Sequence, residues 1–146
     1  MKKLLLTILV AFVVSLAANA RDSYSHDINT LPTAARTVLK NNFKADVSVI
    51  KIDKDFGRVK EYEVILTNGS EITFDRSGNW KEIETSVSTA VPDKMVPQGI
   101  RSWIDKNQKK TRIVGIERTR SGYDVELSNG VEVKFNKNGH FIKYDD

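Results

Sequence analysis

The chain has 146 residues, with 23 lysines and arginines against 19 aspartates and glutamates, two histidines and no cysteine. This length fits one domain or two very small ones. Without residues 1–20, which hold two of the cations, 21 cations minus 19 anions leave a net charge of +2. That charge is too balanced to indicate nucleic-acid binding. The lack of cysteine excludes disulfides and thiolate chemistry.

The first twenty residues have the pattern of a secretory signal peptide. Lysines at positions 2 and 3 form a positive n-region, residues 4–17 are an apolar run, and Ala-Asn-Ala at 18–20 fits a cleavage site. Fourteen residues at about 1.5 Å each reach about 21 Å, short of a hydrocarbon core of about 30 Å. A retained membrane helix is therefore the weaker alternative. We expect cleavage after Ala20, no stable membrane insertion afterwards, and a periplasmic or secreted product that begins with a flexible segment at 21–29.

The remainder of the chain is internally similar. Shifted by 61 positions, residues 62–74 match residues 123–135 in Tyr, Val, Leu, Asn, Gly, Glu and Phe. Upstream, Leu31-Pro32 matches Val96-Pro97, and each pair precedes apolar residues at helical spacing. Proline suits the first turn of a helix. Each copy therefore predicts one short amphipathic helix.

Period-two segments rich in Val, Ile, Tyr and Phe follow each predicted helix and indicate strands. The expected strands are 47–53, 59–67, 70–75 and 79–85 in the first copy, and 112–118, 122–128, 131–136 and 140–145 in the second. The predicted fold is α+β, with two tandem helix-plus-four-stranded antiparallel meander repeats and the helices packed on one sheet face. The repeats span 30–84 and 96–146, joined by an extended connector at 85–95.

The turns of the meanders are predicted from side-chain alternation. A three-residue loop at 67–69 sets Val64 against Ile72 and Tyr62 against Phe74, so that apolar residues face apolar residues. A two-residue turn would mix core and solvent positions. The third loop position then needs a positive φ, which glycine adopts without strain. The structural turn glycines are Gly69, Gly78, Gly130 and Gly139.

The sheet face away from the helices is the candidate contact surface. Simple alternation places charged residues there together with more apolar side chains than a solvated face needs. Aromatic and aliphatic anchors surrounded by charge are typical of binding hot spots. The alternatives are that the two copies pack together at this face, or that isolated exposed apolar residues have no role. The predicted protein-binding residues are Ile65, Ile83, Glu126, Lys134, Ile142 and Tyr144.

The sequence offers little for catalysis or metal binding. His26 and His140 lie far apart, and no nucleophile with a nearby base recurs. The segment 53–57 resembles the start of a calcium loop, but its twelfth position is Val64 instead of a glutamate, so a hairpin turn is the better interpretation. We predict no catalytic residue, no metal site and no cofactor.

The paired motifs resemble a known family. Leu-Pro opening a helix, Tyr-x-Val-x-Leu, Asn-Gly, and Phe-(Asp or Asn)-x-x-Gly occur in two copies over residues 30–146. This pattern is similar to the PepSY-like, β-lactamase-inhibitor-like family of exported bacterial proteins. The resemblance implies an α+β fold, export and no catalysis; PepSY domains are thought to restrain peptidases, and the inhibitor presents a concave sheet to its enzyme. The chain departs from the inhibitor in its short copies and in lacking disulfides.

These observations predict an exported, non-catalytic protein-binding module, such as an inhibitor or accessory factor of an envelope enzyme, for example a peptidase. The expected partner is an unidentified exported or envelope protein and not a nucleic acid. The alternative is a small-ligand carrier that uses a cleft between the repeats.

Overall fold

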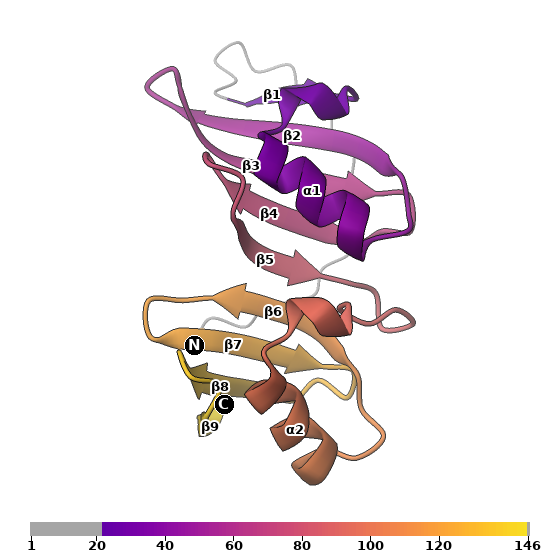
Figure 1. Cartoon of the computed structure of the whole chain (residues 1–146), viewed down its shortest axis with the longest axis vertical. Helices are drawn as coiled ribbons and strands as arrows, with labels where there is room; N and C mark the ends of the chain where they lie inside the picture. The colour runs from indigo at the N-terminus through magenta and orange to yellow at the C-terminus, as the bar shows by residue number, and fades with distance from the viewer. Residues whose placement is uncertain (1–21, 146) are drawn as a thin grey trace.

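The computed structural model describes residues 22–145 of the chain, so the predicted signal peptide and its cleavage site lie outside the described part. Nine strands and two α-helices follow one another along these residues (Figure 1). The elements are β1 (Ser23–Ser25), α1 (Thr33–Asn42), β2 (Val47–Asp55), β3 (Arg58–Leu66), β4 (Glu71–Asp75), β5 (Trp80–Glu84), α2 (Gln98–Asn107), β6 (Ile113–Arg118), β7 (Gly122–Leu127), β8 (Glu132–Asn136) and β9 (Phe141–Asp145). Short 3-10 turns at Ile28–Thr30 and Asp93–Met95 precede the helices.

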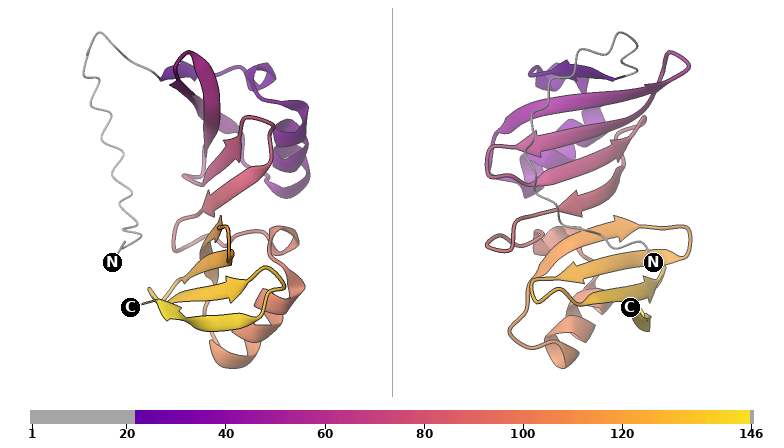
Figure 2. Two further views of the ribbon diagram at one scale, coloured as in Figure 1. Left: turned by 90° about the vertical axis from the view of Figure 1, so that its left-hand side faces the viewer. Right: turned by 180° about the vertical axis from the view of Figure 1, so that it is seen from behind.

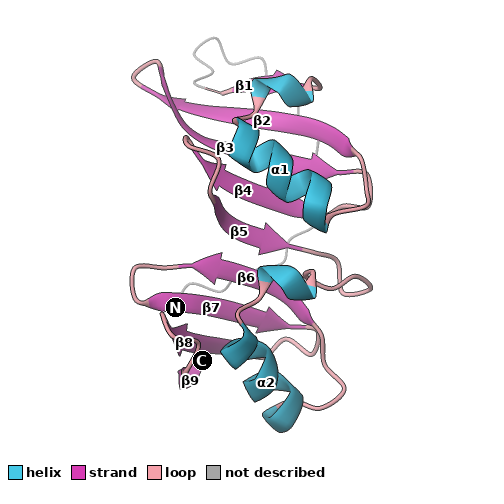
Figure 3. Cartoon of the chain, in the orientation of Figure 1, coloured by secondary structure: helices cyan, strands magenta, loops and turns pink. Residues whose placement is uncertain are grey.

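All nine strands form one antiparallel sheet in the order of the sequence, from β1 to β9. Strand β5 pairs with β6, so the four strands after α1 and the four after α2 share one continuous sheet. Both helices lie on the same side of this sheet, and within residues 22–145 no helix covers its other side (Figures 2 and 3). We call the uncovered side the open face. The predicted α+β class is confirmed.

Both helices begin immediately after a proline, as predicted. Pro32 precedes α1, which buries Ala35 and Leu39, and Pro97 precedes α2, which buries Ile100 and Ile104. Each pair is four residues apart, so it lies on one side of the helix. Helices of ten residues are marginal in isolation. Packing on the sheet therefore stabilises them.

The predicted three-residue loops and their registers are confirmed. Val64 lies opposite Ile72, and Tyr62 lies opposite Phe74. In the second half Val125 lies opposite Val133, and Tyr123 opposite Phe135. All four turn glycines have a positive φ, between 77° and 88°, namely Gly69, Gly78, Gly130 and Gly139.

In β5 and β9 the side chains do not alternate strictly between the two faces of the sheet. Two residues therefore lie on the face opposite to the predicted one. A β-bulge between Trp80 and Glu82 adds one residue, so Ile83 pairs with the core residue Ile72. Ile83 is 0% exposed and lies on the helix side. A bulge in β9 likewise pairs Tyr144 with the core residue Val133. Neither Ile83 nor Tyr144 belongs to the open face, because a bulge reverses the side on which later residues lie.

Two segments predicted to be irregular are ordered. The N-terminal segment, expected to be flexible, forms β1, whose Ser25 pairs with Ile50, and the ion pair of Asp22 with Lys51 at 3.5 Å supports it. The connector at 85–95 contributes Val91 and Met95, 2% and 8% exposed, to the core. One cluster of buried apolar residues spans both halves of the chain.

No helix within residues 22–145 combines the length and the apolar content that a membrane crossing requires.

Candidate functional site

The open face is dominated by carboxylates. The strand registers place acidic residues opposite one another on neighbouring strands: Glu71 lies opposite Glu84, Glu82 opposite Glu117, and Glu126 opposite Glu132. These positions alternate with the core residues and therefore point away from the helices. Carboxylates on this face include Asp53, Glu61, Glu63, Glu71, Asp75, Glu82, Glu84, Glu117, Asp124, Glu126, Glu132 and Asp145.

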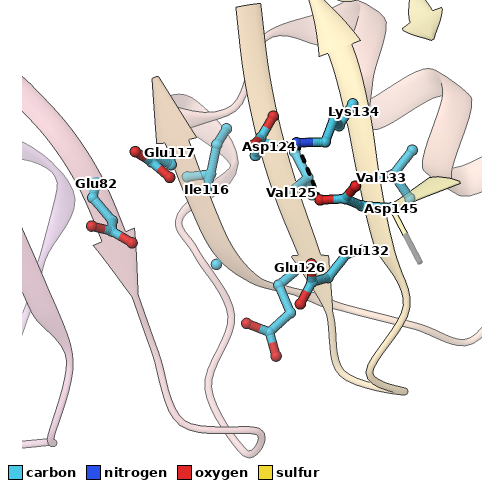
Figure 4. Close-up of a pocket in the computed structure, with 11 residues that line it drawn as sticks. Glu82, Ile116, Glu117, Asp124, Val125, Glu126, Glu132, Val133, Lys134 and Asp145 are labelled. Atoms are coloured by element: carbon cyan, nitrogen blue, oxygen red, sulfur yellow. Dashed lines mark hydrogen bonds and ion pairs between the residues drawn. The ribbon is translucent and has the colours of Figure 1, made fainter. Parts of the chain in front are cut away.

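Lysines only partly balance this charge. Lys51 contacts Glu63 at 3.5 Å, and Lys81 contacts Glu61 at 2.6 Å. Lys134 lies between Asp124 and Asp145, at 3.0 and 3.1 Å (Figure 4). Lys143 is opposite Lys134 and lies 3.9 Å from Asp145. These carboxylates outnumber the lysines that contact them, so the open face is clearly negative, although the chain carries a formal charge of +4.

The face is hollowed where the two halves meet. A depression of about 320 Å³ lies over β3 to β6, and its lining contains six glutamates with one lysine and one threonine. The adjoining part of the face, over β5 to β9, is shown in Figure 4, where acidic side chains line a much smaller depression. The lining of the larger hollow is Glu61, Glu63, Glu71, Thr73, Lys81, Glu82, Glu84 and Glu117.

Burial, together with the crowding of like charges, raises the pKa of several of these glutamates. Burial, the charges of Glu84 and Glu117, and a hydrogen bond with Glu84 raise the pKa of Glu82 to about 7. Burial and the charge of Glu63 raise the pKa of Glu71. Burial, followed by neighbouring carboxylates, also raises the pKa of Glu126 and of Glu132. Such shifts favour the protonated form of these carboxyl groups.

The predicted contact residues separate into two groups. Glu126 and Lys134 lie on the open face, and half-buried Ile65 lies there between Val49 and Glu71. Ile142 is the extra residue of the β9 bulge and is 50% exposed. The structure therefore does not form the apolar patch that the sequence predicted, because its two other members are on the helix side.

Tyr144 instead belongs to an aromatic cluster on the helix side of β9. Its ring centre lies 6.0 Å from that of Trp103 and 5.3 Å from that of Phe141. Trp103 and Phe141 stack at 4.6 Å with their planes 3° apart. Tyr144 Oη also accepts a hydrogen bond of 3.1 Å from Gln108, the residue that follows α2. These contacts anchor β9 to the helix.

The sequence analysis did not predict that carboxylates from several strands gather on the open face. Residues such as Glu82, Glu84 and Glu117 are scattered along the chain, and each is an ordinary solvent-facing residue of its own strand. The signal was nevertheless present: summing charge over the positions opposite the predicted core would have shown it. The two bulges were not visible in the pattern.

The described residues contain no candidate metal centre. Among residues 22–145, no group of three or more histidine or carboxylate side chains is arranged to hold a metal ion. The Nδ1 atom of His26 is 2.7 Å from the carbonyl of Ser48. The segment 53–57 forms a hairpin in which Asp55 pairs with Arg58, in agreement with the turn interpretation.

Comparison with known proteins gives three close structural relatives. A protein named "putative periplasmic protein of unknown function" from Bacteroides vulgatus has 38% identity and a TM-score of 0.79, over 86% of this chain and 99% of its own. A "putative calcium-regulated periplasmic protein" from Bacteroides thetaiotaomicron has 32% identity and a TM-score of 0.78, over 86% and 97%. A second Bacteroides vulgatus periplasmic protein has 34% identity and a TM-score of 0.77, over 89% and 100%.

No curated protein matches the chain. The family model described as "Putative beta-lactamase-inhibitor-like, PepSY-like" matches residues 60–143, which is more than half of the sequence. This match agrees with the motifs in the sequence and with the periplasmic relatives. The chain belongs to the PepSY-like, β-lactamase-inhibitor-like family.

Proposed function

We propose that this protein is an exported, non-catalytic protein-binding module whose open face binds a basic surface of another envelope protein. The observation that carries the proposal is the negative open face, on which the carboxylates outnumber the lysines that contact them. Electrostatic complementarity of this kind steers association and selects partners. A partner that brings lysines or arginines would relieve the repulsion that raises the pKa of Glu71 and Glu82.

Ile65 and Val49 provide a small apolar contact within this charged surface. They lie opposite each other on β3 and β2, and both are half-buried. Glu126 and Lys134 supply charges of both signs on the other half of the face. The proposed contact is therefore mainly ionic, with apolar contributions from Ile65 and Ile142.

Family membership supports a role as an inhibitor or accessory factor. The family description is inhibitor-like, and an inhibitor needs an exposed, pre-formed surface such as this sheet. The periplasmic relatives support periplasmic residence after removal of the leader at residues 1–20. A peptidase or another envelope enzyme with a basic surface near its active site is the proposed class of partner.

We further propose that the two halves are tandem repeats, at 30–84 and 96–146. Each half has one helix followed by four strands, and Tyr62–Phe74 and Tyr123–Phe135 are equivalent register pairs. The bulge in β5, next to Phe74, has a counterpart in β9, next to Phe135. A duplicated half explains why the open face extends with similar chemistry across the sheet.

A small-ligand carrier is the second candidate. The hollow of about 320 Å³ where the halves meet has the volume of a small-molecule site. However, its lining is mostly charged, whereas such sites are usually apolar with a few polar groups. A ligand of this hollow would have to be cationic.

The test compares two triple variants of the mature chain. One carries Glu71→Gln, Glu126→Gln and Glu132→Gln on the open face, at positions with raised pKa values. The matched control carries Asp46→Asn, Asp93→Asn and Asp105→Asn, which removes three charges from exposed positions outside this face. Binding of an octalysine peptide is measured by calorimetry at low and high salt, with an octaglutamate peptide as the negative control.

We expect the open-face variant to bind octalysine roughly tenfold more weakly, and the control variant to bind it like the wild type. Capture from a periplasmic extract, followed by mass spectrometry of proteins and small molecules, should then yield a basic protein that the open-face variant does not retain. Equal binding by the two variants would contradict the role of the open face. A small cation recovered in place of a protein would favour the carrier.

A further inference from the structure

A further hollow, away from the open face, lies where the connector, α2 and the start of β6 meet (Figure 1). Its volume is about 190 Å³, and none of its lining residues lines the larger hollow over β3 to β6. Buried apolar side chains from all three segments contribute to the lining, together with two arginines and two aspartates. We call this feature the arginine hollow, and the residues that define it are Val91, Asp93, Arg101, Ile104, Asp105 and Arg112.

Arg101 of α2 brings an unsatisfied guanidinium group to this hollow. The residue is half-buried, and its Nε atom is buried without a hydrogen-bond partner. Within residues 22–145 its side chain forms no hydrogen bond and no ion pair. Buried donors are nearly always paired, and an unpaired donor destabilises the fold. The arginine hollow therefore contains donors that an acceptor group of a ligand would satisfy.

The corresponding arginine of the first helix is satisfied by its own surroundings. Arg36 occupies in α1 the place that Arg101 occupies in α2, four residues after the proline that precedes the helix. Its Nη1 atom donates to Asn29 at 3.2 Å and its Nη2 atom to Thr33 at 3.0 Å, and only its Nε atom lacks a partner. Asn29 lies three residues before the proline, where the second half has Lys94. A lysine side chain accepts no hydrogen bond, so the acceptor that serves Arg36 has no counterpart beside Arg101.

Arg112 supplies the second cation of the arginine hollow. Its Nη2 atom donates to the carbonyl of Val87 in the connector. Its backbone nitrogen donates to Ser128 Oγ at 3.0 Å, and its carbonyl accepts a hydrogen bond of 2.8 Å from the backbone nitrogen of Ser128. These bonds fix the residue and use one of the five donors of its guanidinium group, so the others are available to a ligand. Two guanidinium groups therefore line one small hollow.

Two carboxylates line the same hollow and do not pair with these arginines. Asp93 and Asp105 are exposed, and neither forms an ion pair with another residue in the range 22–145. Asp105 follows Arg101 by four residues on α2, and an acid placed after the base is the less favourable order for an ion pair on a helix. The lining therefore carries two positive and two negative charges that are not neutralised by contact with each other.

We propose that the arginine hollow binds a small aliphatic α-amino acid by its zwitterionic head group. The carboxylate of the ligand lies against Arg101 and Arg112, because guanidinium groups bind carboxylates through paired, charge-assisted hydrogen bonds. The ammonium group lies beside Asp93 and Asp105. A simple anion would be repelled by the two aspartates and a simple cation by the two arginines, so a ligand with both charges complements the lining best.

The size and the apolar part of the hollow fit a ligand of this class. A volume of about 190 Å³ is below the roughly 300 to 1,000 Å³ of sites for drug-sized ligands, so the ligand is small. Val91 and Ile104 are 2% and 4% exposed and provide an apolar surface for an aliphatic side chain. The arginine hollow shares no residue with the open face, so this proposal does not depend on the proposed protein-binding function.

Titration of the isotope-labelled mature chain with three related ligands, followed by NMR, tests the site. The ligands are L-leucine, N-acetyl-L-leucine, which lacks the ammonium charge, and L-leucinamide, which lacks the carboxylate. We expect L-leucine to shift the amide signals of Arg101, Asp105 and Arg112 to saturation, with a Kd of about 1 mM or lower. Each capped ligand should bind at least about tenfold more weakly, because it loses one set of charge-assisted contacts. The amide signal of Glu63, on the open face, should not move.

Two matched variants test the role of Arg101. Arg101→Gln should weaken the binding of L-leucine at least about tenfold, whereas Arg36→Gln, at the corresponding position of α1, should leave it unchanged. The proposal is wrong if L-leucine causes no saturable shift at the hollow, or if either capped ligand binds as tightly as L-leucine. It is also wrong if Arg101→Gln binds L-leucine like the wild type. The wild-type titrations decide the question even if a variant does not fold.

Discussion

The guanidinium carbon of Arg118 lies 3.7 Å from the centre of the Trp80 ring, so a cation of the second half covers an aromatic residue of the first. Trp80 is 6% exposed and belongs to the core, where it lies opposite Phe74. A cation over an aromatic face is attracted by the ring quadrupole. This contact links the halves on the side of the sheet that carries the helices, opposite the carboxylates.

Replacement of Arg118 by alanine should lower the free energy of unfolding by about 1 kcal/mol, because it removes the cation–π contact and uncovers Trp80. Urea unfolding followed by tryptophan fluorescence measures the change. Arg120→Ala, two residues away at an exposed position, is the control and should be neutral. Equal unfolding of both variants would show that the contact contributes nothing.

The turn glycines differ in what surrounds them, which gives a graded prediction. A Cβ at Gly69 or Gly130 would meet no atom within 4 Å, so valine there suffers only the strain of a positive φ. We expect a loss of more than about 1 kcal/mol at each. A Cβ at Gly78 would lie 2.8 Å from the backbone nitrogen of Ala35, so even Gly78→Ala should cost more than Gly69→Ala. Thermal unfolding of the two alanine variants tests this order.

Tyr144 and Ile142 should respond differently to truncation. Tyr144→Ala removes ring contacts with Trp103 and Phe141 and the hydrogen bond from Gln108, so it should destabilise the protein by about 1 to 2 kcal/mol. Ile142→Ala, at a position that is 50% exposed, should change stability by less than about 0.5 kcal/mol. Calorimetric melting of the single variants distinguishes them. If Tyr144→Ala leaves the stability unchanged, Tyr144 is again a candidate surface contact.

Stability should fall as the pH rises from about 5 to about 8. The pKa of Glu82 is raised in the folded chain from 4.5 to about 7, so the native state binds more protons than the unfolded state across this window. That shift corresponds to about 3 kcal/mol at 1.36 kcal/mol per unit, which solvent screening at a partly exposed group reduces to about 1 kcal/mol. Urea midpoints at the two pH values measure it.

At acid pH the dependence should be reversed, so that the free energy of unfolding increases as the pH rises. Burial alone would raise the pKa of Asp75, but hydrogen bonds from the Asn79 side chain and from the backbone of Asn79, Ser77 and Gly78 outweigh it and lower the pKa. A lowered carboxyl pKa contributes stability that is lost as the pH falls through the folded value. The stability curve should therefore have its maximum in the mildly acidic range, and a maximum at alkaline pH would contradict the assignment of Glu82.

The sequence was sufficient for the helices, the strand order within each half and the loop registers, because these depend on local signals. Pro32 and Pro97 mark helix starts, and the partner of Tyr62 follows from alternation around Gly69. The side occupied by Ile83 and Tyr144 could not be predicted, because one bulged residue reverses it.

The pairing of β5 with β6, and with it the opposition of Glu82 and Glu117, also required three-dimensional information. These strands are separated by the connector and α2, and alternation within each strand gives no register between them. The charge of the open face is a property of the whole sheet. It emerged only when the strands were placed side by side.

The central claim, that the open face is the binding surface, is tested most directly by mapping where a basic ligand binds. The isotope-labelled mature chain is titrated with octalysine, and chemical-shift changes are followed residue by residue by NMR at low salt. We predict the largest changes at open-face residues such as Glu63, Glu84 and Glu126, reduced by added salt. Changes concentrated on α1 and α2, or spread evenly over the surface, would contradict the account.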